Sequence, residues 1–381
     1  MAARWIRAGV AAGIVAAVLP AGPAGASFPG SNGRIAFVSE RSGNLDIWSM
    51  NPNGSGLLNL THNAALDEHP AWNPAGTRVA FDSDRSGRRH VYVMNADGSG
   101  VVDLTPNSSF DYWPAWKPDG TKILFTRASD IWSMNPDGSG ATNLTKSTGT
   151  SERDAEWSPN GSKIAYTRYE GNWELYVMNA DGSAQTRLTT NDEYDFEPNW
   201  APDGSKLVWR SGMGDNVGEI WIMNPNGTGM VDLTNDPAYD REPTWAPDQT
   251  RVAYASVRGT NFEIMAMAPD GSGPVNLTNH ASNDYSPDWG SAPATPPPPG
   301  CTITGTDRND VLVGTPGDDV LCGRGGSDSL DGRGGADILR GGPGGDSLEA
   351  RDGVSGNDAL NGGTGTDRCR ADPGDTKTAC P

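Results

Sequence analysis

The chain has 381 residues, enough for two or three domains at the usual ~100 to 200 residues per domain and too many for a peptide hormone or small toxin. Acidic residues outnumber basic ones by 48 to 29, which gives a formal net charge of −19, so we expect no nucleic-acid partner. Only 35% of the residues are hydrophobic, whereas glycine (50) and proline (29) are frequent. This composition excludes a helical bundle and favours an all-β protein of short strands joined by turns.

The first 26 residues have the order of a secretory signal peptide. Arg4 and Arg7 precede an apolar run from Ala8 to Leu19, and Ala24-Gly-Ala26 offers a small-residue cleavage site. The run is shorter than the ~20 residues of a membrane helix, and no later stretch approaches that length, so we expect no membrane insertion. Cleavage would remove two positive charges and change the net charge from −19 to −21. We therefore expect a secreted protein, either extracellular or on the exterior of the cell envelope.

Residues 27–290 contain one sequence unit six times. The units are spaced by 44, 44, 41, 43 and 45 residues, and their anchors are Ile35-Ala-Phe37, Val79-Ala-Phe81, Ile123-Leu-Phe125, Ile164-Ala-Tyr166, Leu207-Val-Trp209 and Val252-Ala-Tyr254. A period of this length made of short strands is typical of β-propeller blades. In one unit, strands are expected at 67–72, 78–83, 90–94 and 101–105, with a hairpin turn at Asn95-Ala-Asp-Gly98. Each unit is therefore predicted to be one antiparallel four-stranded sheet.

The two ends of the repeat region are complementary. The first unit begins at Arg34 with a second strand and has no inner strand before it, whereas the last unit is followed by an unpaired inner strand at 284–289. If these two segments pair, they complete one blade, close a ring of six blades and leave no open sheet edge. We predict a six-bladed propeller closed between its N- and C-terminal strands.

The repeat resembles the WD40-like units of TolB-type propellers. The resemblance rests on Trp116-Lys-Pro-Asp-Gly120 and Trp200-Ala-Pro-Asp-Gly204, each followed by an apolar strand, a Met-Asn turn and Leu-Thr. It recurs six times and covers about two thirds of the chain. It departs from TolB itself in one respect, because TolB has a separate N-terminal domain and none fits between Ala26 and Arg34.

An acidic residue precedes each inner-strand tryptophan by five positions. The six acids are Asp67, Asp111, Glu152, Asp195, Asp240 and Asp284. Because inner strands line the channel of a propeller, these carboxylates could ring one mouth and bind a cation or a basic ligand. The alternative is structural, since a hairpin about Gly76 places Asp67 opposite Arg85, and Asp240 similarly faces Arg258. We favour ion pairs within each blade, because a feature present in every repeat usually serves the repeat itself.

Three histidines break the symmetry of the repeat. His62 and His69 lie in the connection to the second inner strand, and His280 lies in the connection to Trp289. Together with Asp67 and Asp284 they could form a transition-metal or acid–base site at the channel mouth, although exposed loop histidines are the simpler interpretation. The sequence has no Gly-x-Ser-x-Gly or His-Glu-x-x-His motif, and we assign no catalytic residue.

A second domain follows a proline-rich linker at 291–300. From Gly305 onward the sequence has a nine-residue period of turns that open with glycine and close with aspartate, and a leucine follows most of these aspartates by two residues. The closing residues are Asp310, Asp319, Asp328, Asp337, Asp346, Asp358 and Asp367, with an insertion at 350–352. Glycines let backbone carbonyls point inward, and aspartate adds the anionic oxygen that Ca²⁺ prefers. The alternative is a disordered tail, which the strict period and the in-phase leucine disfavour.

This period is similar to the repeats-in-toxin nonapeptide. Gly341-Gly-Pro-Gly-Gly-Asp346 matches its turn fully, whereas Gly305-Thr-Asp-Arg-Asn-Asp310 is the weakest match. The resemblance implies a parallel β-roll at 301–381 in which calcium lies between turns one coil apart, so that Asp319 would share an ion with the turn of Asp337. We expect calcium as a bound cofactor.

All four cysteines lie in this second domain. An even number in an exported chain indicates disulfides, and three connectivities are possible. We favour Cys301 with Cys322 and Cys369 with Cys380, two local links near the ends of the roll. Metal binding by thiolates is the lesser alternative, because the chain has no Cys-x-x-Cys pair.

These features predict an exported, non-enzymatic binding or scaffold protein. The propeller would recognise an unknown protein or glycan ligand, and calcium would order the C-terminal roll. The alternative is a metal-dependent propeller lyase or hydrolase that acts on an extracellular polymer through the neighbourhood of His62, His69 and His280.

Overall fold

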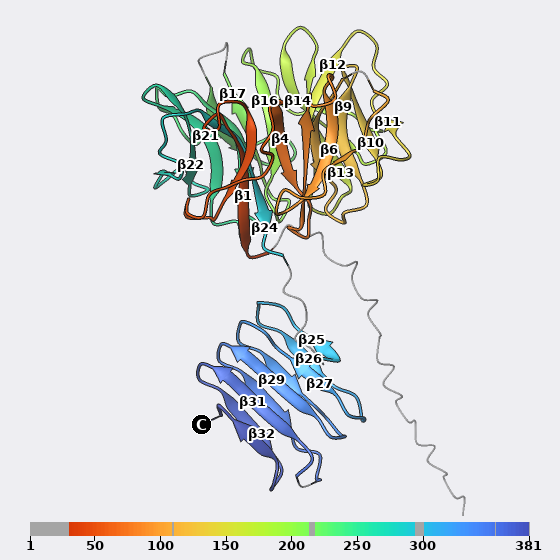
Figure 1. Cartoon of the computed structure of the whole chain (residues 1–381), viewed down its shortest axis with the longest axis vertical. Helices are drawn as coiled ribbons and strands as arrows, with labels where there is room; N and C mark the ends of the chain where they lie inside the picture. The colour runs from red at the N-terminus through yellow and green to blue at the C-terminus, as the bar shows by residue number, and fades with distance from the viewer. Residues whose placement is uncertain (1–29, 109, 213–217, 294–300, 355, 381) are drawn as a thin grey trace, which may run out of the picture. The chain divides into compact units, whose positions relative to one another are not determined.

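The fold is that of a computed structural model, which describes residues 30–108, 110–212, 218–293, 301–354 and 356–380. In these ranges every regular element is a β-strand. The chain divides into two compact units between Pro293 and Ala294, and Figure 1 shows a propeller and a stack of short strands. The predicted signal peptide at 1–26 and most of the predicted linker at 291–300 lie outside the described residues.

The first unit consists of six four-stranded antiparallel sheets, which confirms the predicted propeller. Inner strands are β4 (Asp67–Trp72), β8 (Asp111–Trp116), β12 (Ser151–Trp157), β16 (Asp195–Trp200), β20 (Asp240–Trp245) and β24 (Asp284–Ser291). Second strands are β1 (Asn32–Ser39), β5 (Arg78–Ser83), β9 (Ile123–Arg127), β13 (Lys163–Tyr169), β17 (Leu207–Ser211) and β21 (Val252–Arg258). Third strands are β2 (Asp46–Met50), β6 (His90–Asn95), β10 (Asp130–Met134), β14 (Trp173–Asn179), β18 (Glu219–Met223) and β22 (Asn261–Met267). Outer strands are β3 (Leu58–Asn59), β7 (Val102–Asp103), β11 (Thr142–Asn143), β15 (Thr186–Arg187), β19 (Val231–Asp232) and β23 (Val275–Asn276).

The ring closes as the sequence predicts. Blade 1 has the strand order β24-β1-β2-β3, so it combines the last strand of the propeller with the first three, and blades 2 to 6 follow in chain order from β4. In the closing pair, Ile35 lies opposite Trp289 and Ser39 opposite Asp284. Figure 1 shows β1 and β24 side by side.

The cores of the propeller lie between neighbouring blades. At the closing seam, Ile35, Phe37 and Trp289 of blade 1 pack on Ala253 and Ile264 of blade 6. The repeated Asp-Gly turn also depends on the neighbouring blade. Gly98 has φ of +85°, and a Cβ atom there would lie 2.3 Å from the carbonyl oxygen of Leu60 in the preceding blade. Only glycine provides both the left-handed conformation and this close backbone approach.

The second unit is a parallel β-roll with two sheets. One sheet contains β25 (Ile303–Thr304), β27 (Val320–Cys322), β29 (Ile338–Pro343), β31 (Ala359–Thr364) and β33 (Thr376–Thr378). The other contains β26 (Val311–Val313), β28 (Ser329–Asp331), β30 (Ser347–Ala350) and β32 (Arg368–Ala371). The in-phase leucines face inward, and Leu321, Leu330, Leu339, Leu348 and Leu360 form the buried core. No segment of the described residues forms a helix long and apolar enough to span a membrane.

Candidate functional sites

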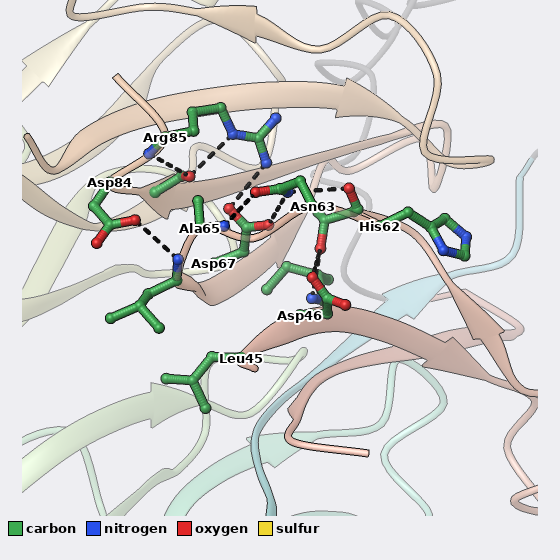
Figure 2. Close-up of polar contacts among 12 residues, drawn as sticks. Leu45, Asp46, His62, Asn63, Ala65, Asp67, Asp84 and Arg85 are labelled. Carbon is green, nitrogen blue, oxygen red and sulfur yellow. Dashed lines mark hydrogen bonds and ion pairs between the residues drawn. The ribbon is translucent and has the colours of Figure 1, made fainter. Parts of the chain in front are cut away.

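The six repeated acids lie inside the blades. The carboxylate of Asp67 is fully buried and accepts hydrogen bonds from Arg85 Nη2 at 2.9 Å and Asn63 Nδ2 at 2.7 Å, as Figure 2 shows. Ion pairs at matching positions are Arg41–Asp284 (2.6 Å), Arg127–Asp111 (2.7 Å), Arg168–Glu152 (3.4 Å) and Arg258–Asp240 (4.0 Å). In blade 5, Asp195 instead accepts a hydrogen bond from Trp209 Nε1 at 2.9 Å. The predicted ion pairs within blades are therefore confirmed in five blades.

The structure does not bring His62, His69 and His280 into one cluster. His62 and His280 are exposed, and Figure 2 shows the His62 imidazole directed away from Asp67 and Arg85. His69 lies in the channel, while Asp67 and Asp284 are bound to their arginines. No three His, Cys, Asp or Glu side chains in the described ranges are grouped to hold a metal ion.

The channel is lined by the third residue of each inner-strand motif, two positions after the repeated acid. All six of these residues have positive φ, between +49° and +58°, and none is glycine: His69, Trp113, Asp154, Glu197, Glu242 and Ser286. The register of each inner strand shifts here, for example between Glu68 and Ala71, so the strand bulges and turns this side chain toward the channel. The residues line a cavity of about 150 Å³.

Hydrogen bonds between blades hold this ring of left-handed residues. The backbone N–H of Glu242 donates to Glu197 Oε2 at 2.8 Å, and the N–H of Ser286 donates to Glu242 Oε2 at 2.6 Å. In blade 3, the N–H of Trp113 donates to Asp82 Oδ1 at 3.1 Å. Left-handed conformations of residues other than glycine cost of order 1–3 kcal/mol each, and they persist where surrounding contacts enforce them. Strain of this kind is concentrated at functional sites.

His69 is a positively charged residue of the channel lining. Its Nδ1 lies 2.7 Å from Asp82 Oδ1, and its ring contacts Trp113 edge-on. Burial alone lowers the pKa of His69, but the Asp82 carboxylate, with Glu68 and Glu242 nearby, outweighs it and raises the pKa to about 9. The imidazole is therefore protonated at neutral pH.

An aromatic–arginine collar lies near the start of the inner strands of blades 1 and 3 to 6. We define it as Tyr112, Trp113, Arg153, Trp173, Phe196, Arg210, Tyr239, Arg241, Phe262 and Tyr285. The Arg153 guanidinium lies 4.4 Å from the centre of the Phe196 ring, and that of Arg241 lies 4.3 Å from the centre of Phe262. Phe110, 53% exposed, stacks on Tyr112 and extends the collar outward. Cation–π contacts of this kind contribute about 0.5–2 kcal/mol each and hold the arginines in place.

Deeper in the channel, two carboxyl groups face each other from opposite blades. Glu156 belongs to blade 4 and Asp288 to blade 1, and both line the channel cavity. Burial raises the pKa of Asp288 to about 6. Burial and the charge of Asp288 raise the pKa of Glu156 well above its ordinary value. Neither carboxyl has an arginine or lysine partner in the described part of the chain. We call Glu156 and Asp288 the acid pair.

Of the six lining residues, only His69 is predicted from the sequence as a site residue. The repeated acid is recognisable because it recurs, whereas the lining residue two positions later changes type from blade to blade. The sequence indicates the lining position only through its variation between two constant residues. The repeated acid lies two positions before it and the inner-strand tryptophan three positions after it. The bulge that turns the residue inward cannot be recognised from composition.

The closing aspartates of the roll are stacked in two rows. Asp310, Asp328, Asp346 and Asp367 form one row, and Asp319, Asp337 and Asp358 form the other. In each row the backbone N–H of one aspartate donates to Oδ1 of the aspartate one coil later, as from Asp328 to Asp346 at 2.8 Å. Burial, together with the neighbouring acids, raises the pKa of Asp328.

The later turns fit a calcium ion. The second carboxylate oxygens of Asp328, Asp346, Asp358 and Asp367 are buried and have no hydrogen-bond partner. A buried, unpaired carboxylate oxygen is costly unless a cation or donor reaches it, and Ca²⁺ takes carboxylate and carbonyl oxygens as ligands. When bound, the ion would neutralise the aspartates and join neighbouring coils.

Both predicted disulfides are present. Cys301 is bonded to Cys322 with a Cα–Cα distance of 6.1 Å, and Cys369 is bonded to Cys380 with a distance of 5.7 Å. Cys369 and Cys380 also pack against the leucine core, and Cys322 is buried. One disulfide therefore links residues at the start of the roll to each other, and the second links residues at its end.

Comparison with known proteins agrees with this division. The family model of the TolB beta propeller domain, PD40, matches residues 16–172. The model of the RTX calcium-binding nonapeptide repeat matches residues 304–339, 317–348 and 331–354. No curated protein matches the chain.

Several solved structures share the propeller fold. TolB from Acinetobacter baumannii is 22% identical with a TM-score of 0.58, and the match covers 68% of this chain and 67% of TolB. The putative TolB from Agrobacterium tumefaciens is 17% identical with a TM-score of 0.53, covering 67% of this chain and 97% of the other. A chain of a nidogen/laminin complex is 14% identical with a TM-score of 0.57, and the match covers 68% of this chain and 98% of the other. At these identities the likeness concerns the fold alone. The protein combines a TolB-like PD40 propeller domain with RTX calcium-binding nonapeptide repeats.

Proposed function

We propose that this is an exported, non-enzymatic binding protein whose propeller channel receives a segment of a partner, while calcium orders the C-terminal roll. The observation that carries the proposal is the channel itself, in which six left-handed residues from six blades line one cavity of about 150 Å³. Concave cavities with a few convergent polar groups are the usual form of binding sites. Disulfides and RTX repeats support an extracellular location.

The collar and the acid pair together favour a protein segment with a basic side chain over a neutral glycan. Aromatic rings and arginines at the mouth offer stacking surfaces and hydrogen-bond donors. Below them, Glu156 and Asp288 offer two carboxyl groups without a basic partner. A lysine or arginine side chain that entered the channel would supply that partner and release the protons that the raised pKa values retain.

The test uses the full chain in calcium and two matched arrays of probes. One array carries peptides that differ only by lysine or norleucine at a single position, and the other carries glycans. The double variant E156Q/D288N removes the acid pair. The control D192N/E193Q makes the same charge change at two exposed residues outside the channel.

We expect lysine peptides to bind the wild type and the control, and to lose at least tenfold in affinity for E156Q/D288N. Binding should release protons, which calorimetry in buffers of different ionisation enthalpy detects. Binding of glycans alone, or peptide binding that E156Q/D288N leaves unchanged, would contradict the proposed segment. A transition metal retained after chelation, together with cleavage of a polymer, would favour the metal-dependent lyase or hydrolase instead.

A further inference from the structure

The turns of the roll fall into two classes that differ at one carboxylate oxygen. In the later turns, Oδ1 of the closing aspartate accepts the N–H of the aspartate one coil earlier, as in Asp310 to Asp328 (2.8 Å) and Asp319 to Asp337 (2.9 Å), whereas Oδ1 of Asp319 accepts the Thr302 hydroxyl at 3.1 Å. This contact aligns successive turns and leaves Oδ2 for another partner. The identity of that partner separates the first two turns from the later ones.

In the first two turns, a threonine occupies Oδ2. The backbone N–H of Thr306 donates to Asp310 Oδ2 at 2.6 Å, and its hydroxyl donates at 2.8 Å. Thr315 makes the same two bonds to Asp319 Oδ2, at 2.7 and 2.8 Å. Two donors satisfy the outward oxygen of each carboxylate without any ion.

In four of the five later turns, all but the one closed by Asp337, Oδ2 is buried without a donor. Asp328 and Asp346 are each 2% exposed, Asp358 is 4% exposed and Asp367 is 5% exposed, yet Oδ2 of all four is buried and unpaired within the described residues. Oδ2 of Asp328, Asp346 and Asp367 lies beside the first glycine of its turn, as Oδ2 of Asp310 and Asp319 does in the first two turns. A cation is the partner that would compensate the buried charge.

The backbone distinguishes the first two turns from the turns closed by Asp328, Asp337, Asp346 and Asp367, whereas of the second and fourth residues in the turn closed by Asp358 only the fourth, Gly356 (+78°), is left-handed. The second residue of the turn has positive φ at Arg324 (+79°), Arg333 (+69°), Gly342 (+108°) and Gly363 (+96°). The fourth residue is also left-handed in these turns, at Gly326, Gly335, Gly344 and Gly365. Thr306 and Thr315 are not left-handed, and neither are the fourth residues of their turns, Arg308 and Gly317.

The left-handed conformation changes the direction of the backbone carbonyl groups in the turn. The carbonyl oxygen of Arg324 lies 1.7 Å from where a Cβ atom of Gly342 would stand, and that of Gly326 lies equally close to the same point at Gly344. Carbonyls in these turns therefore point along the row, toward the next turn. In the first turn, the Thr306 carbonyl accepts the N–H of Gly325 at 3.3 Å.

We propose that the turns closed by Asp310 and Asp319 bind no calcium and form a metal-free cap, and that the calcium rows begin at Asp328 and Asp337. The ions would lie between Asp328 and Asp346, between Asp346 and Asp367, and between Asp337 and Asp358. The Cys301–Cys322 disulfide holds the cap in place of the missing ions. A threonine at the second position of the turn is thus the feature that excludes the ion.

The test counts calcium on the full chain. The protein is stripped with chelator, and bound calcium is measured by equilibrium dialysis and by calorimetric titration with CaCl₂. The variants D310N and D319N alter the cap, and D346N makes the same substitution in a predicted site. The variant T315R/P316G gives the second turn the first four residues of the turn that begins at Gly332.

We expect D310N and D319N to bind as much calcium as the wild type, with unchanged affinity. D346N should bind less, because Asp346 serves two of the proposed ions. T315R/P316G should bind one additional ion per chain, a gain that an unfolded variant cannot produce. Loss of calcium in D310N or D319N, with a circular dichroism spectrum unchanged at saturating calcium, would overturn the cap. An unchanged calcium count in T315R/P316G would overturn the role of threonine.

Discussion

Asp240 and Asp111 occupy the same repeat position, but the structure predicts opposite consequences when each is replaced by asparagine. Asp111 is fully buried, and Arg127 donates to both of its oxygens at 2.7 Å. Asp240 is equally buried, but Arg258 Nη2 is 4.0 Å away, because Arg258 Nη1 bonds Asp236 at 3.1 Å. Asp240 Oδ1 accepts the Ser256 hydroxyl, and Oδ2 has no hydrogen-bond partner within the described residues.

The magnitude follows from the pKa of Asp240. Burial raises this pKa from 3.8 to about 6, in spite of the Ser256 hydrogen bond. At about 1.36 kcal/mol per pKa unit, ionised Asp240 costs the native state about 3 kcal/mol above pH 6. The cost is absent below pH 3.8, where both states are protonated, grows as pH rises from 3.8 to the folded pKa of about 6, and is complete above it. D240N should therefore raise the free energy of unfolding at pH 7.5 by up to about 3 kcal/mol. D111N should lower it by about 3–5 kcal/mol, because it leaves Arg127 without its charge partner.

The assay is urea unfolding followed by tryptophan fluorescence at several pH values in constant calcium. Apart from Trp5 in the predicted signal peptide, every tryptophan lies between Trp48 and Trp289, so the signal reports the propeller and not the roll. The stability difference between D240N and the wild type should shrink between pH 6 and pH 4. A destabilised D240N at pH 7.5, or a difference that does not vary with pH, would refute the reasoning.

Four further predictions follow from the same structure. The pKa of His69 is raised to about 9, so protonated His69 contributes about 3 kcal/mol to the free energy of unfolding. This contribution is complete below pH 6.5 and is lost as pH rises through 9. The variant H69Q should remove this pH dependence in the same urea assay. Deleting 285–290 from the full chain should lower the thermal midpoint of the propeller, because it removes the inner strand of blade 1, whereas deleting 294–299 should not. When calcium is added to chelated protein, circular dichroism should show that the roll gains β structure. Replacing Asp337 and Asp346 together by alanine should raise the calcium concentration at the midpoint of this transition. A spectrum that is already ordered in chelator would count against calcium-dependent folding. The mature chain should not be retained on heparin or DNA columns at low salt, given its net charge of −21.

Local sequence was sufficient for the repeat architecture. The units spaced by 41 to 45 residues determined the number of blades, because each unit encodes one complete sheet with its own turns. The order of the end segments determined the closure, since an inner strand without a blade can pair only with a blade that lacks one. The nine-residue period determined the roll for the same reason, and the positions of the cysteines near its ends favoured the two disulfides that the structure contains.

The channel could not be predicted in this way. Its lining depends on a bulge in each inner strand and on hydrogen bonds that cross from one blade to the next, such as Ser286 to Glu242. The acid pair joins Glu156 to Asp288, residues that are far apart in sequence and face each other only because six blades close into a ring. The sequence places Glu156 on β12 and Asp288 on β24, but only the closure of the ring brings these two carboxyl groups to face each other.

The same distinction holds within the roll. The sequence alone determined that turns closed by aspartate recur and that leucines fill the interior, because both features repeat with the coil. Whether Asp319 or Asp346 has a free oxygen was decided by the tertiary structure, through the backbone conformation of the second residue in each turn. A repeat in the sequence specifies which elements form and how they stack. The partners of each polar atom depend on the conformation that the stacked neighbours impose.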